Sequence, residues 1–383
     1  MYKDDKKIED VGNLTFYGMK RIFPLALLSI CIVTSCNTHN ESVVDSVNLK
    51  SQAAIIDTMY SNMFPTYMIG NIVISNELHG EENYYANIIE NNKSSKPELV
   101  FKKGHGHNEF TLLTFGRADD KSLLLLDGTL NAKPASLTVI SETDSISNIK
   151  EQENWKRYDL RNLPPFRLAA KKFCTLSDST ILIPGATYDH FGSILSVIDF
   201  KNCKAFPLDY FPNDGIEVEP MVKHAVYTDN SSVFGNGNGR YCYQCGEERF
   251  VFIFSIDKNK VNIIKDLYTV YPDYKTEDGQ NYSMKSRRPE TLMCAVNNDY
   301  VFILLKEFDK EGNKRDEWRP NLYGNIVEVY DWDGNKQKEI HLDHYGQRIM
   351  LSGDNKLHLF TDDYYDAEFK SDIWIYDLKG IVD

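Results

Sequence analysis

Hydrophobic and polar residues alternate in short runs along most of the chain, and this alternation predicts β-strands. Typical runs are KSLLLLDG (121–128), STILIPGAT (179–187) and DYVFILLKE (299–307), and Gly, Asp, Asn or Pro residues bound most of them. A 3.6-residue period is almost absent. The pattern therefore predicts an all-β protein.

One unit of four short strands recurs along the chain. Counted by the second strand of each unit, the copies lie near Ile72, Leu123, Ile181, Val233, Phe302 and Leu357. The copies recur at intervals of about 50–70 residues, longer than the ~40–50 of compact propeller repeats, and the excess lies in loops such as 271–290 and 307–324. Six copies predict a six-bladed β-propeller over residues 53–383. A β-sandwich would explain one unit, but six copies exceed one sandwich.

The last unit lacks its fourth strand. Residues 54–60 (AIIDTMY) have the composition of a strand and precede the first unit. We expect them to complete the final blade, because a closed ring has no unpaired edge strands.

The N-terminal segment has the pattern of an export signal. Residues 22–35 form an uncharged run after Lys20 and Arg21, too short for the roughly 20 residues of a membrane-spanning helix. We expect residues 1–18 to be an over-extended start and residues 19–35 the signal peptide.

The signal ends in Val33-Thr34-Ser35-Cys36, which resembles the lipobox of bacterial lipoproteins. The resemblance implies that Cys36 is lipidated and anchors the mature chain to a membrane, with residues 36–52 as a polar tether. The alternative is a buried N-terminal helix with two incidental cysteines.

Composition and charge narrow the class of partner. Hydrophobic residues make up 42% of the chain, enough for a sizeable core, and the net charge of -13 with a pI near 5.2 opposes binding to nucleic acid. The same charge opposes electrostatic binding to an anionic membrane, so a lipid is the expected anchor. Five cysteines remain after Cys36, and this odd number leaves at least one free thiol.

A short motif extends the resemblance over the mature chain. Residues Gly104-His105-Gly106-His107-Asn108-Glu109-Phe110 resemble the Gly-x-Gly-x-x-Glu-Phe crossover of TolB-like and NHL-like six-bladed β-propeller lipoproteins of Bacteroidetes. Asp331-Trp332-Asp333-Gly334-Asn335 matches a hairpin of that family, and its Asp-Gly step predicts a tight turn rather than a calcium loop. The resemblance implies the fold and an extracytoplasmic location, as an outer membrane lipoprotein on the periplasmic side or the cell surface. It supplies no reaction.

Few residues suggest chemistry. Cys242 and Cys245 form a Cys-x-x-Cys pair, for which we expect a local disulfide in an oxidising compartment. The His105-x-His107 pair lacks a third ligand, so we expect no metal and no cofactor. Candidate ligand contacts lie in the long loops; they are Arg240, Trp318, Tyr364, Tyr365 and Asp366. The alternative is that these are ordinary solvated loops without a ligand.

These features favour a membrane-anchored binding module for an unknown protein or glycan. The long loops are the expected contact surface, at 235–249, 271–290, 307–324 and 361–371. The alternative is an enzyme that acts on glycans, a lyase or hydrolase with carboxylates at the mouth of the propeller channel. No catalytic motif in the sequence supports it, so whether the protein is an enzyme stays open, leaning to no.

Overall fold

The computed structural model describes residues 44–55, 62–117, 121–128, 134–276, 282–284, 290–307, 323–363 and 370–382. Within these residues strands dominate, and the two α-helices, α1 (Ile146–Lys150) and α2 (Pro220–Thr228), are short. Neither helix has the length and apolar character that a membrane span requires.

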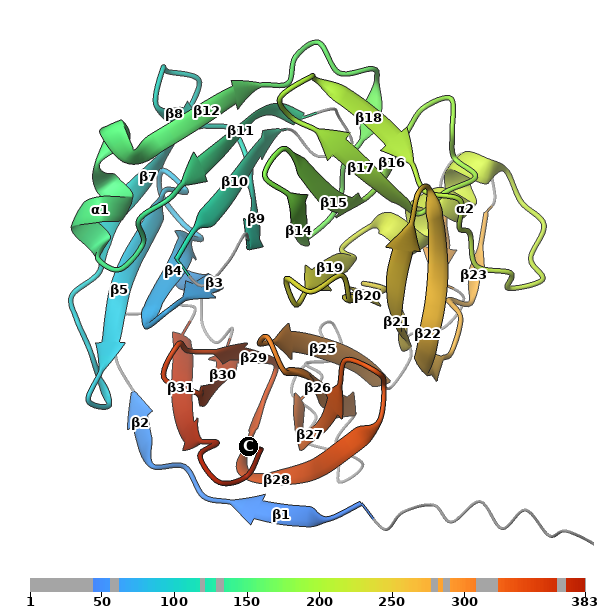
Figure 1. Cartoon of the computed structure of the whole chain (residues 1–383). Helices are drawn as coiled ribbons and strands as arrows, with labels where there is room; N and C mark the ends of the chain where they lie inside the picture. Colours follow the sequence, from blue (N-terminus) through green and yellow to red (C-terminus); the bar gives the residue numbers. More distant parts are fainter. Residues whose placement is uncertain are drawn as a thin grey trace, which may run out of the picture. The chain divides into compact units, whose positions relative to one another are not determined.

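The strands form antiparallel meanders, in which each strand pairs with the strands that precede and follow it (Figure 1). The first meander contains β3 (Met63–Ile69), β4 (Ile72–Glu77), β5 (Tyr84–Glu90) and β7 (Glu98–Lys103). The second contains β9 (Leu113–Arg117), β10 (Leu123–Gly128), β11 (Pro134–Ile140) and β12 (Trp155–Asp159). The third contains β14 (Lys172–Ser177), β15 (Thr180–Pro184), β17 (Leu195–Asp199) and β18 (Lys204–Pro207).

Longer strands make up the C-terminal meanders. One contains β19 (Ser232–Gly235), β20 (Tyr241–Gln244), β21 (Phe250–Asp257) and β22 (Lys260–Thr269). The next contains β25 (Glu290–Val296), β26 (Tyr300–Glu307), β27 (Tyr323–Asp331) and β28 (Lys336–Gly346). The last contains β29 (Arg348–Leu351), β30 (Lys356–Asp363) and β31 (Lys370–Asp377).

Short strands decorate the meanders. They are β6 (Lys93–Ser94), β8 (Glu109–Phe110), β13 (Phe166–Arg167), β16 (Ala186–Thr187), β23 (Tyr274–Lys275) and β24 (Ser283–Met284). A 3-10 turn, η2 (Gln152–Asn154), precedes β12.

Burial falls from the second strand of a meander to its fourth. Every residue of β10 is buried, because both faces of this strand pack against neighbouring meanders. The fourth strand β22 is mostly exposed and carries alternating polar residues. Each fully buried leucine of β10 contributes roughly 1.5–3 kcal/mol relative to an exposed one. The apolar second strands therefore hold successive meanders together.

The first strands of the meanders meet around one cavity. Residues of β3, β9, β14, β19, β25 and β29 all line it. The strand β14 also pairs in parallel with β9 on one side and with β19 on the other. Antiparallel meanders that pack face to face and direct their first strands to a common centre form a β-propeller.

Two N-terminal strands join the C-terminal meanders. The strand β2 (Ala53–Ile55) pairs antiparallel with β31, which confirms that this segment extends the last meander; residues 56–60 of the predicted strand lie outside the described residues. The strand β1 (Ser46–Leu49) pairs in parallel with β28. Residues 46–49 were expected in the tether, and the structure differs there.

The predicted fourth unit differs from the structure. Val233 lies in the first strand β19, and the second strand is β20, because the Gly-rich segment 235–240 is the hairpin turn between them. The residues shortly before Val233, where the predicted unit would place its first strand, lie largely in α2. Pro220 occupies the first turn of α2, where the missing N–H costs nothing.

Two motifs have the conformations that the sequence indicates. The Asp331–Asn335 segment is the β27–β28 hairpin turn: Asp331 N–H donates to the Asn335 carbonyl, and Gly334 has a φ of 82°. In the crossover, the Glu109 carboxylate accepts a 2.8 Å hydrogen bond from the Gly106 N–H. Glu109 and Phe110 then pair with the end of β7, so this crossover is an ordered element.

Candidate functional site

The central cavity has a volume of about 270 Å³. Its polar lining comes from several meanders and comprises Tyr67, Arg117, Lys172, Asn297, Asn298, Asp299, Ser352 and Asn355. Apolar side chains, among them Phe234, Val296 and Met350, form the rest of the wall. A cavity of this size lies near the lower end of the range found for small-molecule sites.

Lys172 places a positive charge in the cavity. It is the first residue of β14, and its backbone pairs with Phe115 of β9 and Ser232 of β19, which fixes the base of the side chain. The ammonium Nζ lies 5.5 Å from the centre of the Phe234 ring, a cation–π contact. No carboxylate pairs with Lys172 in the described part of the chain.

The surroundings of Lys172 disfavour its charge. The side chain is half-buried and lines the cavity. Burial, together with the positive charges of Arg348 and Lys171, lowers the pKa of Lys172 to about 8, while the Cys294 thiol opposes the shift. At neutral pH Lys172 is therefore mostly protonated, and its positive charge has no negatively charged partner in the described part of the chain.

Tyr67 adds a hydroxyl to the cavity wall. Its ring stacks on Phe115 of the next meander, with 5.4 Å between ring centres and 17° between planes. Burial holds the pKa of Tyr67 well above its usual value, so the phenol is neutral and available to donate. Its hydroxyl makes no hydrogen bond to another described residue.

Arg117 crosses the cavity from one side to the other. From the end of β9 its guanidinium donates to the Val296 carbonyl at 3.2 Å and to the Asn298 side chain at 3.4 Å. These acceptors lie at the end of β25, so Arg117 connects two meanders that are far apart in sequence. Its first role is structural.

Tight turns form one mouth of the cavity. The Asn297 side chain accepts hydrogen bonds from the backbone of Asp299 and Tyr300 at 3.0 and 2.7 Å, an arrangement that fixes the turn. Two other hairpin turns that line the cavity meet where Gly353 N–H donates to the Gly70 carbonyl at 3.1 Å. A Cβ added to Gly353 would lie 3.3 Å from the Gly70 Cα, so this close approach favours glycine.

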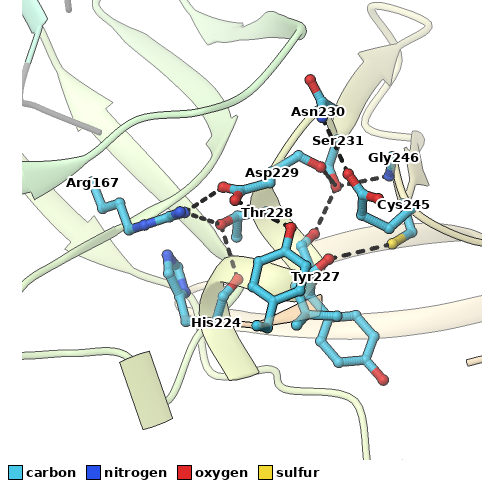
Figure 2. A network of polar contacts seen from close by, with 12 residues as sticks. Arg167, His224, Tyr227, Thr228, Asp229, Asn230, Ser231, Cys245 and Gly246 are labelled. Atoms are coloured by element: carbon cyan, nitrogen blue, oxygen red, sulfur yellow. Dashed lines mark hydrogen bonds and ion pairs between the residues drawn. The ribbon is translucent and has the colours of Figure 1, made fainter. Parts of the chain in front are cut away.

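A second polar cluster lies around α2 (Figure 2), and its labelled residues do not line the cavity. Arg167 of β13 forms a 2.6 Å ion pair with Asp229 and a 3.1 Å hydrogen bond with Thr228. The Thr228 hydroxyl donates to the His224 carbonyl at 2.9 Å. The Tyr282 hydroxyl donates to Asp229 at 3.3 Å. The charged groups of this cluster have partners within the chain.

The start of α2 is anchored in the same way. The Lys223 ammonium pairs at 2.5 Å with Asp214, whose side chain is fully buried. The Tyr227 hydroxyl donates to the same carboxylate at 2.9 Å. His224 is completely buried, its Nδ1 hydrogen-bonds to the Ser193 carbonyl at 2.8 Å, and burial lowers its pKa to about 4. This cluster attaches α2 to its surroundings, and its residues do not line the central cavity.

The candidate contact residue Arg240 does not line the cavity. It lies on the β19–β20 hairpin, and its guanidinium is 3.5 Å from Asp333 of the β27–β28 hairpin. The segment 235–249, expected as a long loop, contains β20. Trp318, Tyr364, Tyr365 and Asp366 lie outside the described residues, as does Cys36.

The expected Cys242–Cys245 disulfide is not present, and both thiols are free and buried. Residues three apart on a strand point to opposite faces and span roughly 10 Å, beyond the ~7 Å between Cα atoms that a disulfide tolerates. Cys242 accordingly packs against Cys294 in one hydrophobic cluster, and Cys245 packs in another. Within the described residues, no group of three His, Cys, Asp or Glu side chains is arranged to hold a metal.

Sequence reasoning missed Lys172 and Tyr67, the two cavity residues whose polar groups have no hydrogen-bond partner in the described chain. Lys172 follows Lys171 at the start of an apolar strand, a pattern that equally fits a solvated strand end. Its enclosure depends on Phe234 and Arg348, which are distant in sequence. The sequence signal was a lysine at the first position of the inner strand β14, a position that the other inner strands fill with different residues.

Comparison with known proteins yields similarity to solved structures only. No family model and no curated protein matches the chain. A fungal alcohol oxidase of the AA5 family in complex with copper is 13% identical, with a TM-score of 0.45; the match covers 86% of this chain and 76% of that chain. The β-propeller domain of Cps50 (Swd1) from Myceliophteria thermophila is 9% identical, with a TM-score of 0.40 and coverage of 84% and 98%. Hydrazine synthase from Kuenenia stuttgartiensis is 10% identical, with a TM-score of 0.36 and coverage of 85% and 79%. At these values no activity transfers, and the propeller fold rests on the strand pairings above.

Proposed function

We propose that this chain is a lipid-anchored extracytoplasmic binding protein, built on a six-bladed β-propeller that binds a ligand in its central cavity. Support for the blade number comes from the meanders that begin with β3, β9, β14, β19, β25 and β29. The pairing of β2 with β31 supplies the last of them with an outer strand, as closure of a ring requires.

The cavity is the observation that carries the binding function. It is framed by inner strands whose positions are fixed by sheet hydrogen bonds, and Lys172 and Tyr67 present polar groups to it that have no hydrogen-bond partner in the described chain. Rigid frames with a few open polar groups are typical of small-molecule sites. Asp299 is the one carboxylate among the described residues that line the cavity, whereas glycoside hydrolysis generally needs a pair. The site therefore favours binding over hydrolysis.

Membrane attachment is proposed from the lipobox alone. In cells, Cys36→Ala should abolish fatty-acid labelling and move the protein to the soluble fraction, with Cys203→Ala as the control that keeps both. Continued membrane retention of Cys36→Ala without labelling would contradict the anchor. If the anchor holds, the outer membrane is the expected location, on its periplasmic side or at the cell surface.

Ligand binding is tested with a variant that closes the mouth of the cavity. Asn298 is exposed and lines the cavity, so Asn298→Trp should block entry without disturbing the core. We expect the full chain to retain a glycan, a glycan-derived acid or another small ligand in affinity selection, and Asn298→Trp to lose it. Lys201→Trp places the same side chain on an exposed turn away from the cavity and is the matched control. Equal retention by all three proteins would contradict binding in the cavity.

A further inference from the structure

The chemical class of the ligand follows from the charge in the cavity, and this step rests on the proposed binding function. The chain carries a net charge of -13, yet the cavity wall contributes Lys172 and Arg117 against a single exposed carboxylate, Asp299. The local charge is therefore opposite in sign to that of the whole molecule. Such a reversal inside a negatively charged protein selects for a negatively charged ligand.

Lys172 is the group with unused binding capacity. An ammonium taken out of water without a carboxylate partner is costly, and an apolar side chain at this position would stabilise the fold. The Phe234 ring offsets part of this cost through the cation–π contact. An anion that enters the cavity would offset the rest of the free-energy cost of burying this ammonium.

The other groups that face Lys172 do not neutralise it. Arg348 of β29 and the adjacent Lys171 are positive and repel it, and Cys294 of β25 is a buried thiol. Arg117 of β9 is positive and is held by Val296 and Asn298 across the cavity. An anion at this point would meet positive charge from more than one strand.

Tyr67 supplies the directional contact. Its hydroxyl lies on the same cavity, is neutral, and has no acceptor among the described residues. An oxyanion takes a charge-assisted hydrogen bond from a phenol and an ion pair from an ammonium at the same time. A neutral sugar would use only the hydrogen bond well, because it carries no charge to pair with the ammonium.

We propose that the central cavity binds the oxyanion group of a small ligand, with the Lys172 ammonium as its counter-ion and the Tyr67 hydroxyl as its hydrogen-bond donor. The volume of about 270 Å³ suits a small ligand, such as a sugar acid, phosphate or sulfate. Asn298, at the mouth, is placed to contact its neutral part.

Calorimetric titration of the full chain with D-galacturonate, D-galactose and inorganic phosphate tests the proposal. We expect an oxyanion to bind and D-galactose, the neutral match of galacturonate, not to bind. Tighter binding of galacturonate assigns the site to organic acids, and tighter binding of phosphate assigns it to phosphates.

Variants identify the groups responsible. Lys172→Met should weaken oxyanion binding about tenfold or more, and Tyr67→Phe, which keeps the ring stacked on Phe115, by a smaller factor. Lys171→Met removes a neighbouring exposed lysine and should leave binding within about twofold. Melting temperatures no lower than that of the wild type show that the variants are folded, so that a loss of binding reports the missing side chain.

Two results would overturn the oxyanion proposal. One is equal binding of an oxyanion by the wild type and by folded Lys172→Met; the other is no binding of either oxyanion at millimolar concentration. These failures are distinct from failure of the proposed function. If a ligand selected by the wild type is lost in Asn298→Trp but kept in Lys172→Met, the cavity binds a neutral ligand and only the oxyanion assignment falls.

Discussion

The α2 cluster and the central cavity each contain a basic side chain removed from bulk water, but only one of these charges is paired. Arg167 meets Asp229 at 2.6 Å and Thr228 at 3.1 Å, whereas Lys172 meets the face of Phe234 and two positive neighbours. The first arrangement attaches a helix to the propeller. The second leaves a charge that a ligand can neutralise.

The contrast separates structural polar groups from groups available for binding. A buried charge that is paired within the chain is compatible with a stable fold only while its partners are present. A charge without such a partner lowers stability and persists where it has another use. Stability and binding should therefore respond in opposite ways when the two regions are altered.

The largest effect is expected at the paired charge. Asp229→Asn leaves Arg167 without a counter-charge in a largely buried site and should lower the free energy of unfolding by about 3–5 kcal/mol. Denaturant unfolding monitored by tryptophan fluorescence measures the change. Asp159→Asn disrupts an exposed ion pair with Arg161 and should leave the unfolding midpoint almost unchanged. A small effect of Asp229→Asn would remove the distinction between the two regions.

Acid should destabilise the α2 cluster through His224. Burial lowers the pKa of His224 to about 4 in the folded protein, whereas the unfolded chain has a pKa near 6.5. The unfolded state therefore takes up the proton first, and stability should fall as the pH drops from 6.5 to 4, by about 3 kcal/mol from this residue.

His224→Asn keeps a donor near the Ser193 carbonyl and removes the titrating ring. Its free energy of unfolding should depend less on pH between 6.5 and 4 than that of the wild type. Part of the acid dependence should remain, because burial lowers the pKa of His358 to about 4 as well. Identical pH profiles for His224→Asn and wild type would exclude the proposed role of His224.

Alkaline pH should act at the unpaired charge in the opposite direction. The pKa of Lys172 is about 8 in the folded protein and 10.5 in the unfolded chain, so the unfolded state holds more protons between these values. The stability of the wild type relative to Lys172→Met should rise by about 3 kcal/mol from pH 8 to 10.5. A difference that is flat across this range would mean that Lys172 is solvated or paired.

The smallest effect concerns the thiols. Cys203 is half-buried and Cys174, Cys242, Cys245 and Cys294 are buried, so iodoacetamide should label Cys203 first in the native protein. The hydrogen bond to Cys294, together with burial, raises the pKa of Cys242 well above its usual value, which slows its alkylation further. Peptide mass spectrometry before and after unfolding gives the order. A Cys242–Cys245 disulfide in the purified protein would contradict the strand geometry.

The sequence predicted the features that depend on local pattern. Alternating apolar residues revealed the meanders, Asp333-Gly334 the β27–β28 turn, and residues 54–55 the strand added to β31. The helix α2 was missed because nine residues with mixed apolar and polar character give no clear helical period. The disulfide predicted between Cys242 and Cys245 was wrong because their Cys-x-x-Cys spacing is too extended for a disulfide when it lies along a strand.

The cavity was beyond prediction for a different reason. Its polar groups, Lys172 and Tyr67, come from separate meanders, and their environment is set by side chains from others, such as Phe234 and Arg348. The loops that attracted attention are long, whereas the mouth of the cavity is built from tight turns at Asn297 and Gly353. The meeting of side chains from separate meanders at one cavity can be seen only in the folded structure.

Diffraction from crystals of the protein soaked in selenate tests the central claim most directly, since selenium marks the oxyanion by its anomalous signal. We predict an anomalous peak inside the cavity with a selenate oxygen about 3 Å from Lys172 Nζ, and its absence in Lys172→Met. Peaks confined to surface lysines such as Lys171, with none in the cavity, would contradict the account.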